Sequence, residues 1–231
     1  DMGGAVFEPV TVADRAAETA LRAVLERERP DDAILGEEFG ETEGSSGLTW
    51  VLDPIDGTRG YISGTPTWGV LISVADKTGP LFGLIDQPYI GERFAGGFGV
   101  AEVHGPLGHS VLTCRKDRNL YEATVLTTFP EVGTAAEGAA FHAVASQAKL
   151  TRYGMDCYGY ALLAAGQVDL VIEAGLNPYD IHAPIAVVMA AGGDVTDWTG
   201  GPAHAGGRAI AAATPALHAE ALAILQKTLH A

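Results

Sequence analysis

The chain has few cysteines. Only two of its 231 residues are cysteine, Cys114 and Cys157, and they lack the spacing of a zinc site. Two cysteines are too few for a disulfide framework, so we expect both to be small buried side chains in a protein of the reducing cytoplasm. The start of the chain, "DMGGAVFEPV", also lacks the basic and then apolar pattern of a secretory signal, which favours the same cytoplasmic location.

Basic residues and long apolar runs are also scarce. Asp and Glu number 29 against 14 Lys and Arg, which gives a formal net charge of −15. Nucleic-acid binding depends mainly on Lys and Arg that neutralise phosphates, so we expect no nucleic-acid partner. No apolar run approaches the roughly 18 to 20 residues that a membrane-spanning helix needs, so we expect no membrane span. The acidic excess indicates either solubility or carboxylates that hold cations.

Helix and strand patterns alternate along the chain. Apolar spacing predicts a helix over 11–30 that Pro30 ends, then short strands at 33–36 and 48–53 and a strand meander over 67–99. Further strands are expected at 110–116, 123–129, 168–175 and 194–200, and helices at 133–150, 157–167, 180–193 and 216–231. This order predicts an α/β fold of layered sheets and helices. The turn-rich "HGPLGHS" divides it into halves, 1–108 and 109–231, that pack as one unit.

Acidic residues follow the apolar strands. Glu37 and Glu38 come after the first strand, Asp53 and Asp56 after the second, and Asp180 after the strand at 168–175. Ligands of α/β proteins gather where strands end, so we expect these carboxylates to converge. Crowded carboxylates repel one another, and hard divalent cations such as Mg²⁺ relieve that repulsion because they prefer oxygen ligands.

The stretch "WVLDPIDGTRGY" carries the densest pattern. Pro54 stiffens a turn so that both aspartates aim into one site, and the Ile55 carbonyl, freed from the strand ladder, offers a further oxygen. Gly57 lets the chain approach a ligand closely, and Thr58 begins a segment whose N–H groups face an anion. The alternative is that the aspartates are ordinary turn and cap residues.

"DPIDGTR", preceded by "LGEE" and followed by "YDIHAPIAVVMAAGG", resembles the inositol monophosphatase family of Mg²⁺-dependent, lithium-sensitive phosphatases, which share a layered αβαβα fold with fructose bisphosphatases. The match runs from "PVTVADR" to Gly193. The resemblance implies two or three Mg²⁺ per site and a homodimer. It also implies metal ligands at Glu37, Asp53, the Ile55 carbonyl, Asp56 and Asp180, phosphate contacts at Asp56, Gly57, Thr58 and Arg59, and an Asp14–Thr58 hydrogen bond that acts with Glu37 on the attacking water.

The chemistry that the residues favour is the same. Two metal ions neutralise a phosphate ester, lower the pKa of a bound water and hold the leaving oxygen, and Asp53 is the ligand that we expect to bridge them. The sequence shows no Cys or Ser nucleophile with a paired His and no Gly-rich loop that ends in Lys-Ser/Thr. Direct attack by water is therefore favoured over a covalent intermediate.

The segments "GMDCY", "LNPYD" and "TDWTG" resemble the histidinol-phosphate phosphatase branch of the family. Histidinol phosphate carries an ammonium and an imidazole, so pocket acids at Asp156 or Glu173 would pair with them. Asp156 is as readily explained as a helix N-cap before 157–167. Inositol monophosphate, fructose bisphosphate and a phosphorylated nucleotide remain alternative substrates. A catalytically idle, metal-binding regulatory protein is the alternative outside the enzymes.

Overall fold

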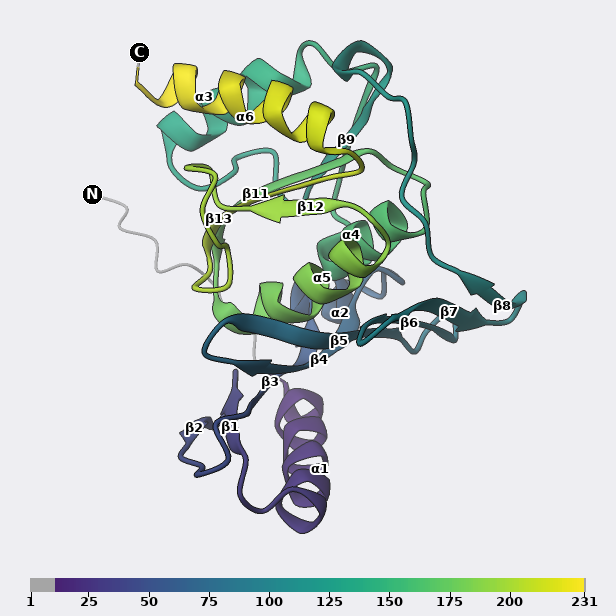
Figure 1. Cartoon of the computed structure of the whole chain (residues 1–231), viewed down its shortest axis with the longest axis vertical. Helices are drawn as coiled ribbons and strands as arrows, with labels where there is room; N and C mark the ends of the chain where they lie inside the picture. Colours follow the sequence, from purple (N-terminus) through teal and green to yellow (C-terminus); the bar gives the residue numbers. More distant parts are fainter. Residues whose placement is uncertain (1–10, 231) are drawn as a thin grey trace.

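The computed structural model describes residues 11–230 and stacks its elements in five layers (Figure 1). The first layer is helix α1 (Val12–Glu28), which covers the outer face of an eight-stranded sheet. Helices α4 (Asp156–Ala164) and α5 (Pro178–Ala190) form the middle layer. A five-stranded sheet follows, and α3 (Ala135–Ala145) and α6 (Pro215–Leu229) cover its far side. This order confirms the layered α/β fold expected from the sequence.

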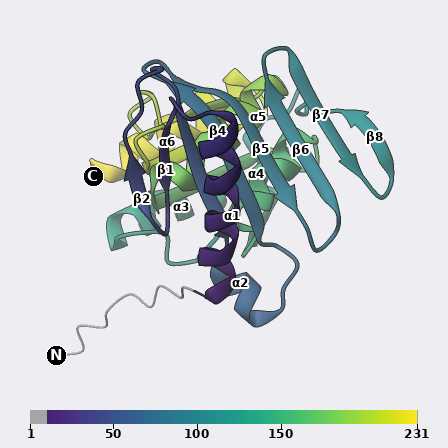
Figure 2. The ribbon, with the colours of Figure 1, turned by 90° about the horizontal axis from the view of Figure 1, so that it is seen from below.

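The first sheet has the strand order β2-β1-β3-β4-β5-β6-β7-β8. Its strands β1 and β3 are parallel, and the other neighbours are antiparallel. Figure 2 shows α1 lying across this sheet. The bounds are β1 Ala33–Gly36, β2 Gly40–Thr42, β3 Thr49–Asp56, β4 Gly69–Asp76, β5 Gly79–Gln87, β6 Glu92–Gly97, β7 Val100–Gly105 and β8 Gly108–Val111, with the short helix α2 (Thr58–Ser63) between β3 and β4.

The prediction of a strand over 110–116 in the second half of the chain is wrong in its bounds and in the sheet to which the strand belongs. Strand β8 ends at Val111 and is the edge of the first sheet, because the turn at 106–107 folds it back on β7. Residues 112–116 then leave the sheet, and the Cys114 N–H donates to the carbonyl of Ala191 at the end of α5. The first sheet therefore extends slightly past residue 108, where the sequence suggested a boundary between halves.

The second sheet has the order β10-β9-β11-β13-β12. Strand β9 runs parallel to β10 and β11, whereas β13 is antiparallel to β11 and β12. The sequence did not indicate β13, because its Gly- and Ala-rich residues have little strand propensity. The bounds are β9 Thr124–Thr127, β10 Leu150–Tyr153, β11 Leu170–Leu176, β12 Asp194–Thr196 and β13 Gly207–Ala212, and the single 3-10 turn η1 covers Leu120–Glu122.

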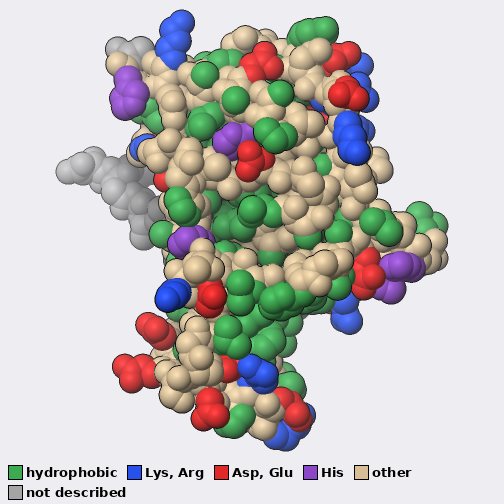
Figure 3. Space-filling view, in the orientation of Figure 1, with side chains coloured by type: hydrophobic (Ala, Val, Ile, Leu, Met, Phe, Trp, Pro, Cys, Tyr) green, Lys and Arg blue, Asp and Glu red, His purple; other side chains and the backbone are tan. Residues whose placement is uncertain are grey.

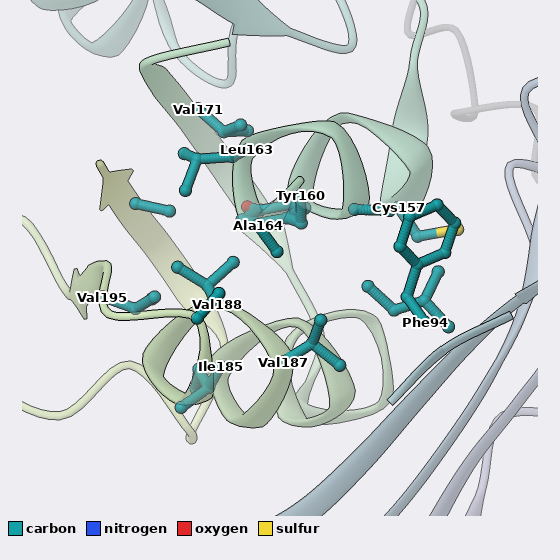
Figure 4. Packing of buried hydrophobic residues seen from close by; sticks show 14 of the residues in the cluster. Phe94, Cys157, Tyr160, Leu163, Ala164, Val171, Ile185, Val187, Val188 and Val195 are labelled. Atoms are coloured by element: carbon teal, nitrogen blue, oxygen red, sulfur yellow. The ribbon is translucent and has the colours of Figure 1, made fainter. Parts of the chain in front are cut away.

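Helices α4 and α5 lie between the two sheets and carry the main core. Phe94 of β6, Tyr160 and Leu163 of α4, Val187 of α5 and Val171 of β11 belong to one buried apolar cluster (Figure 4). Helix α5 lies so close to the first sheet that a Cβ atom on the β5 residue at position 83 would come within 2.5 Å of a backbone carbonyl of the helix. Glycine at that position lets the middle layer and the sheet approach each other.

The cysteines and the helices agree with two further expectations. Cys114 and Cys157 are both free and buried. Between residues 11 and 230, the helices are all too short or too polar to cross a membrane.

Candidate active site

A bulge at the end of β3 places two aspartates on one face of the first sheet. Asp53 lies opposite Leu71 of β4, and Asp56 lies opposite Gly69, so three steps along β3 match two steps along β4. In a regular strand, residues three apart point to opposite faces. The extra residue of the bulge removes that alternation, and Pro54 within it has no N–H to lose from the ladder.

Three carboxylates meet where this bulge faces helix α5. Ligand oxygens of Asp53, Asp56 and Asp180 all lie within 4.8 Å of one another. In each carboxylate one oxygen accepts a backbone N–H: Asp53 from Ile55 at 3.0 Å, Asp56 from Cys157 at 2.6 Å and Asp180 from Asn177 at 2.7 Å. These contacts fix the orientation of all three side chains before any ligand binds.

The carboxylates line a cavity of about 200 Å³ between the two sheets. Six acidic side chains line it, and among residues 11–230 none of the lining residues is Lys, Arg or His. An anionic ligand is repelled by such a lining unless cations enter with it. The acids are Glu37, Asp53, Asp56, Asp156, Glu173 and Asp180.

Burial and mutual repulsion raise the pKa values of these acids. Burial raises the pKa of Asp53 well above its ordinary range, and the charges of Asp56 and Glu37 add to the effect. Burial likewise raises the pKa of Asp56, with Asp156 the next cause, and raises the pKa of Glu37 to about 7. Carboxylates whose charged form is this unfavourable are strong sites for a compensating cation.

Glu37 occupies the turn between β1 and β2, and α1 holds that turn in place. Its Oε2 atom is buried without a hydrogen-bond partner. The fully buried Glu18 of α1 accepts the N–H of Glu38 at 2.7 Å and of Phe39 at 3.3 Å. Arg22 donates to Glu18 at 2.7 Å and also bonds the hairpin at Thr42 and the carbonyl at position 40. We call this pair of α1 residues the hairpin clamp.

The predicted hydrogen bond between Asp14 and Thr58 is absent from the structure. Asp14 instead closes the capping box of α1, where one carboxylate oxygen accepts from the backbone and hydroxyl of Thr11. Its Oδ1 atom is buried without a partner. The Thr58 hydroxyl donates to the Ile55 carbonyl at 3.1 Å, so its proton is already engaged.

Gly57 and Asp156 pack directly against each other. Gly57 has φ +81°, and a Cβ atom there would lie 2.8 Å from the Asp156 carboxyl carbon. Asp156 is the first residue of α4 with φ +45°, and Met155 is the N-cap, so the cap explanation for Asp156 is wrong. Burial raises the pKa of Asp156 to about 6, while the charge of Arg59 opposes that rise. The Arg59 side chain is itself exposed, with its guanidinium 4.7 Å from the centre of the Phe129 ring.

Glu173 of β11 also lines the cavity. It is 6% exposed and accepts from the N–H and hydroxyl of Thr128 and from the Tyr160 hydroxyl at 3.3 Å. Burial raises its pKa to about 7 despite these hydrogen bonds. Glu37, Asp156 and Glu173 are thus the acids that line the cavity beyond the three clustered carboxylates.

Comparisons with known proteins agree with this geometry. The sequence profile of the inositol monophosphatase family matches residues 4–230. The chain belongs to the inositol monophosphatase family. It is 44% identical over 196 residues to the bifunctional phosphatase IMPL2, chloroplastic, of Arabidopsis thaliana, covering 84% of this chain but only 56% of that protein. It is 36% identical to the histidinol-phosphatase of Mycobacterium tuberculosis, covering 88% of this chain and 79% of that protein.

A solved inositol monophosphatase from Zymomonas mobilis has the same fold. The two superpose with a TM-score of 0.85 at 35% identity, over 97% of this chain and 89% of that one. The family resemblance in "DPIDGTR" is therefore confirmed for both sequence and fold.

The oxygen donors of this family member suit a hard divalent cation. Its three clustered carboxylates, the buried unpartnered oxygen of Glu37 and the Ile55 carbonyl at the bulge form an all-oxygen donor set. Mg²⁺ prefers such donors. The residues present therefore fit magnesium.

Several residues of the site carry no signal in the sequence. The Cys157 N–H that orients Asp56 comes from 101 positions away, and Thr128 reaches Glu173 across 45 positions. In the sequence, Glu18 and Arg22 have the i,i+4 spacing of an ion pair on the exposed face of an amphipathic helix. In the structure, the β1–β2 hairpin buries both residues. The close approach of Glu18 to the hairpin requires glycine at position 36, because a Cβ atom there would lie 1.9 Å from the Glu18 carboxylate.

Proposed function

We propose that this protein is a Mg²⁺-dependent phosphoric monoester hydrolase that converts L-histidinol phosphate to L-histidinol and phosphate, a step of histidine biosynthesis. The main support for phosphatase activity is the convergence of Asp53, Asp56 and Asp180 within 4.8 Å in a cavity lined by six acids. Family membership supports the same reaction class. A phosphate enters such a cavity only together with cations.

The proposed ligands of two or three Mg²⁺ ions are Glu37, Asp53, the Ile55 carbonyl, Asp56 and Asp180, with Asp53 shared between two ions. Bound Mg²⁺ would neutralise the phosphate and acidify the attacking water. Glu37 suits the role of proton acceptor, because its buried Oε2 atom has no hydrogen-bond partner. Asp14 remains a proposed member of this proton path through its unpartnered Oδ1 atom.

The phosphate is proposed to lie against the backbone N–H groups of Gly57, Thr58 and Arg59 beside Asp56. Gly57 keeps the main chain accessible there, since any side chain would collide with Asp156. The remaining substrate atoms then extend toward Glu173, which lines the same cavity.

Histidinol phosphate is preferred because the cavity has acids beyond those that the metal ions require. Asp156 and Glu173 both have raised pKa values, near 6 and 7. A cationic ligand group stabilises their charged forms, whereas a neutral polyol does not. The relatives named histidinol-phosphatase, at 32% to 36% identity, support this substrate.

Phosphate release measured on a panel of esters tests the proposal. The panel contains L-histidinol phosphate, inositol 1-phosphate, fructose 1,6-bisphosphate and 3′-phosphoadenosine 5′-phosphate, each with Mg²⁺ and with chelator. We expect the highest kcat/KM for L-histidinol phosphate and none in chelator. Faster turnover of another ester would contradict the substrate, and no turnover of any would favour a catalytically idle regulatory protein.

Inositol 1-phosphate is the second candidate substrate. Its support is the Zymomonas mobilis inositol monophosphatase, which is 35% identical and has the same fold. Two variants separate the candidates: Glu173→Gln and Asp156→Asn should raise KM for L-histidinol phosphate and leave KM for inositol 1-phosphate nearly unchanged.

We also propose that the protein is a lithium-sensitive, cytoplasmic homodimer that binds neither nucleic acid nor membranes. The family resemblance supports the dimer and the lithium sensitivity, and light scattering checks the oligomeric state. The organisation into halves 1–108 and 109–231 is likewise proposed, with the cavity between them.

A further inference from the structure

A second cluster of metal-binding residue types lies far along the first sheet, on the β7–β8 hairpin. Figure 3 shows histidine side chains beside acidic ones on the projecting arm that these strands form. The cluster consists of Glu102 and His104 of β7 and His109 of β8. The three side chains are partly or largely exposed, at 37%, 57% and 50%. None of them lines the active-site cavity.

The hairpin register brings these side chains together. His104 and His109 are directly opposite each other across the two strands, and their rings stack with centroids 4.4 Å apart. Glu102 lies two residues before His104, so both point from the same face of β7. That face is opposite to the one on which neighbouring Phe94 of β6 packs into the core.

The distances suit three ligands of a single ion. The Nε2 atoms of His104 and His109 lie 3.2 and 3.1 Å from the two oxygens of Glu102, and ligand atoms of all three lie within 4.8 Å of one another. Adjacent ligands around a tetrahedral zinc ion are about 3.3 Å apart. The alternative is a pair of hydrogen bonds from the imidazoles to one carboxylate, which needs no ion.

The positive charge of the neighbouring Arg93 is compensated, so it does not oppose the binding of a cation by these three side chains. Arg93 of β6 lies directly opposite His104, but its guanidinium donates to Asp86 at 2.7 Å. Its positive charge is therefore compensated within the sheet.

We propose that Glu102, His104 and His109 form a binding site for a divalent transition metal, with Zn²⁺ as the best fit. Imidazole ligands favour such metals over Mg²⁺, which distinguishes this site from the all-oxygen cluster at Asp53. Three protein ligands leave a fourth position for water on the exposed face. Bound metal cross-links β7 to β8, an edge strand whose four residues are all exposed.

Calorimetric titration of the untagged full chain with Zn²⁺ tests this site. Millimolar Mg²⁺ is kept present so that it competes at the all-oxygen cluster. The variants are His104→Ala, His109→Ala and Glu102→Gln. The matched control is His142→Ala, which removes an exposed histidine of α3.

We expect the wild type and the control to bind one more Zn²⁺ than the double variant His104→Ala/His109→Ala. Each single substitution should weaken that binding at least about tenfold. Zn²⁺ should also slow hydrogen exchange of the β8 amides in the wild type and not in the double variant. Equal Zn²⁺ stoichiometry in the wild type and the double variant, with both folded by circular dichroism, would overturn the proposal.

Discussion

Removing the Glu18 carboxylate should destabilise the whole molecule and misplace Glu37. The Glu18→Ala change deletes acceptors for Arg22 at 2.7 Å and for the Glu38 and Phe39 N–H groups at 2.7 and 3.3 Å. It also leaves Arg22, a residue that is only 8% exposed, without its carboxylate partner.

Breaking a buried ion pair by removing one partner costs about 3 to 5 kcal/mol. Arg22 retains its bonds to Thr42 and to the carbonyl at position 40, so we expect the lower end, about 3 kcal/mol. In a domain of this size that loss corresponds to a melting temperature roughly 6 to 12 °C lower. The hairpin that carries Glu37 loses its anchor on α1, so kcat should fall as well.

Urea unfolding at neutral pH with Mg²⁺ present measures the effect. Glu26→Ala is the matched control, since Glu26 is an exposed acid of the same helix, and its change should stay within about 0.5 kcal/mol. A Glu18→Ala protein whose free energy of unfolding falls by less than about 1 kcal/mol and whose kcat stays at the wild-type value would contradict the stabilising role of the hairpin clamp.

Three further changes follow from the site. Asp53→Asn should keep the fold and abolish nearly all Mg²⁺-dependent phosphate release; wild-type turnover in a folded variant would contradict the assignment of Asp53 as the shared ligand. Gly57→Ala should reduce kcat/KM at least tenfold, because its Cβ would lie 2.8 Å from the Asp156 side chain at φ +81°, and Gly64→Ala, also at positive φ but in open space, is the control. In chelator, the contribution of Glu173 to the free energy of unfolding should fall as the pH rises from about 4.5 to 7. Its pKa is raised from 4.5 to about 7 in the folded state, so in this range the folded protein keeps a proton that the unfolded chain has released. Urea unfolding of the wild type and Glu173→Gln across that range should show the wild type losing stability relative to the variant, and parallel pH profiles would contradict the raised pKa.

The sequence predicted most of the layer order and the clustered carboxylates. Helical and strand periodicity predicted the alternating elements, and the family resemblance implied the order of the layers. The acids were expected beyond the strand ends, whereas Asp53 and Asp56 lie within β3 and Asp180 lies in the first turn of α5, although all three do converge. The turn expected at Pro54 is a bulge instead, because β3 continues through Asp56. This bulge explains how both aspartates reach one face.

The contacts that orient these acids were not predictable, because they join distant segments. Asp14 shows the difficulty, since its sequence position suits both a capping box and a partner for Thr58, and the structure forms only the capping box. Burial of Glu18 depends on a hairpin twenty residues later in the chain. The weak strand β13 was missed because its pairing with β11, rather than its own composition, makes it a strand.

Steady-state phosphate release from L-histidinol phosphate and inositol 1-phosphate, each with and without Mg²⁺, measures both the proposed reaction and its substrate preference. We expect Mg²⁺-dependent release with a higher kcat/KM for L-histidinol phosphate than for inositol 1-phosphate, and we expect Glu173→Gln to lower kcat/KM for L-histidinol phosphate selectively. A higher kcat/KM for inositol 1-phosphate, unaffected by the loss of the Glu173 charge, would contradict the proposed substrate. Absence of Mg²⁺-dependent release from either would contradict the proposed catalytic site.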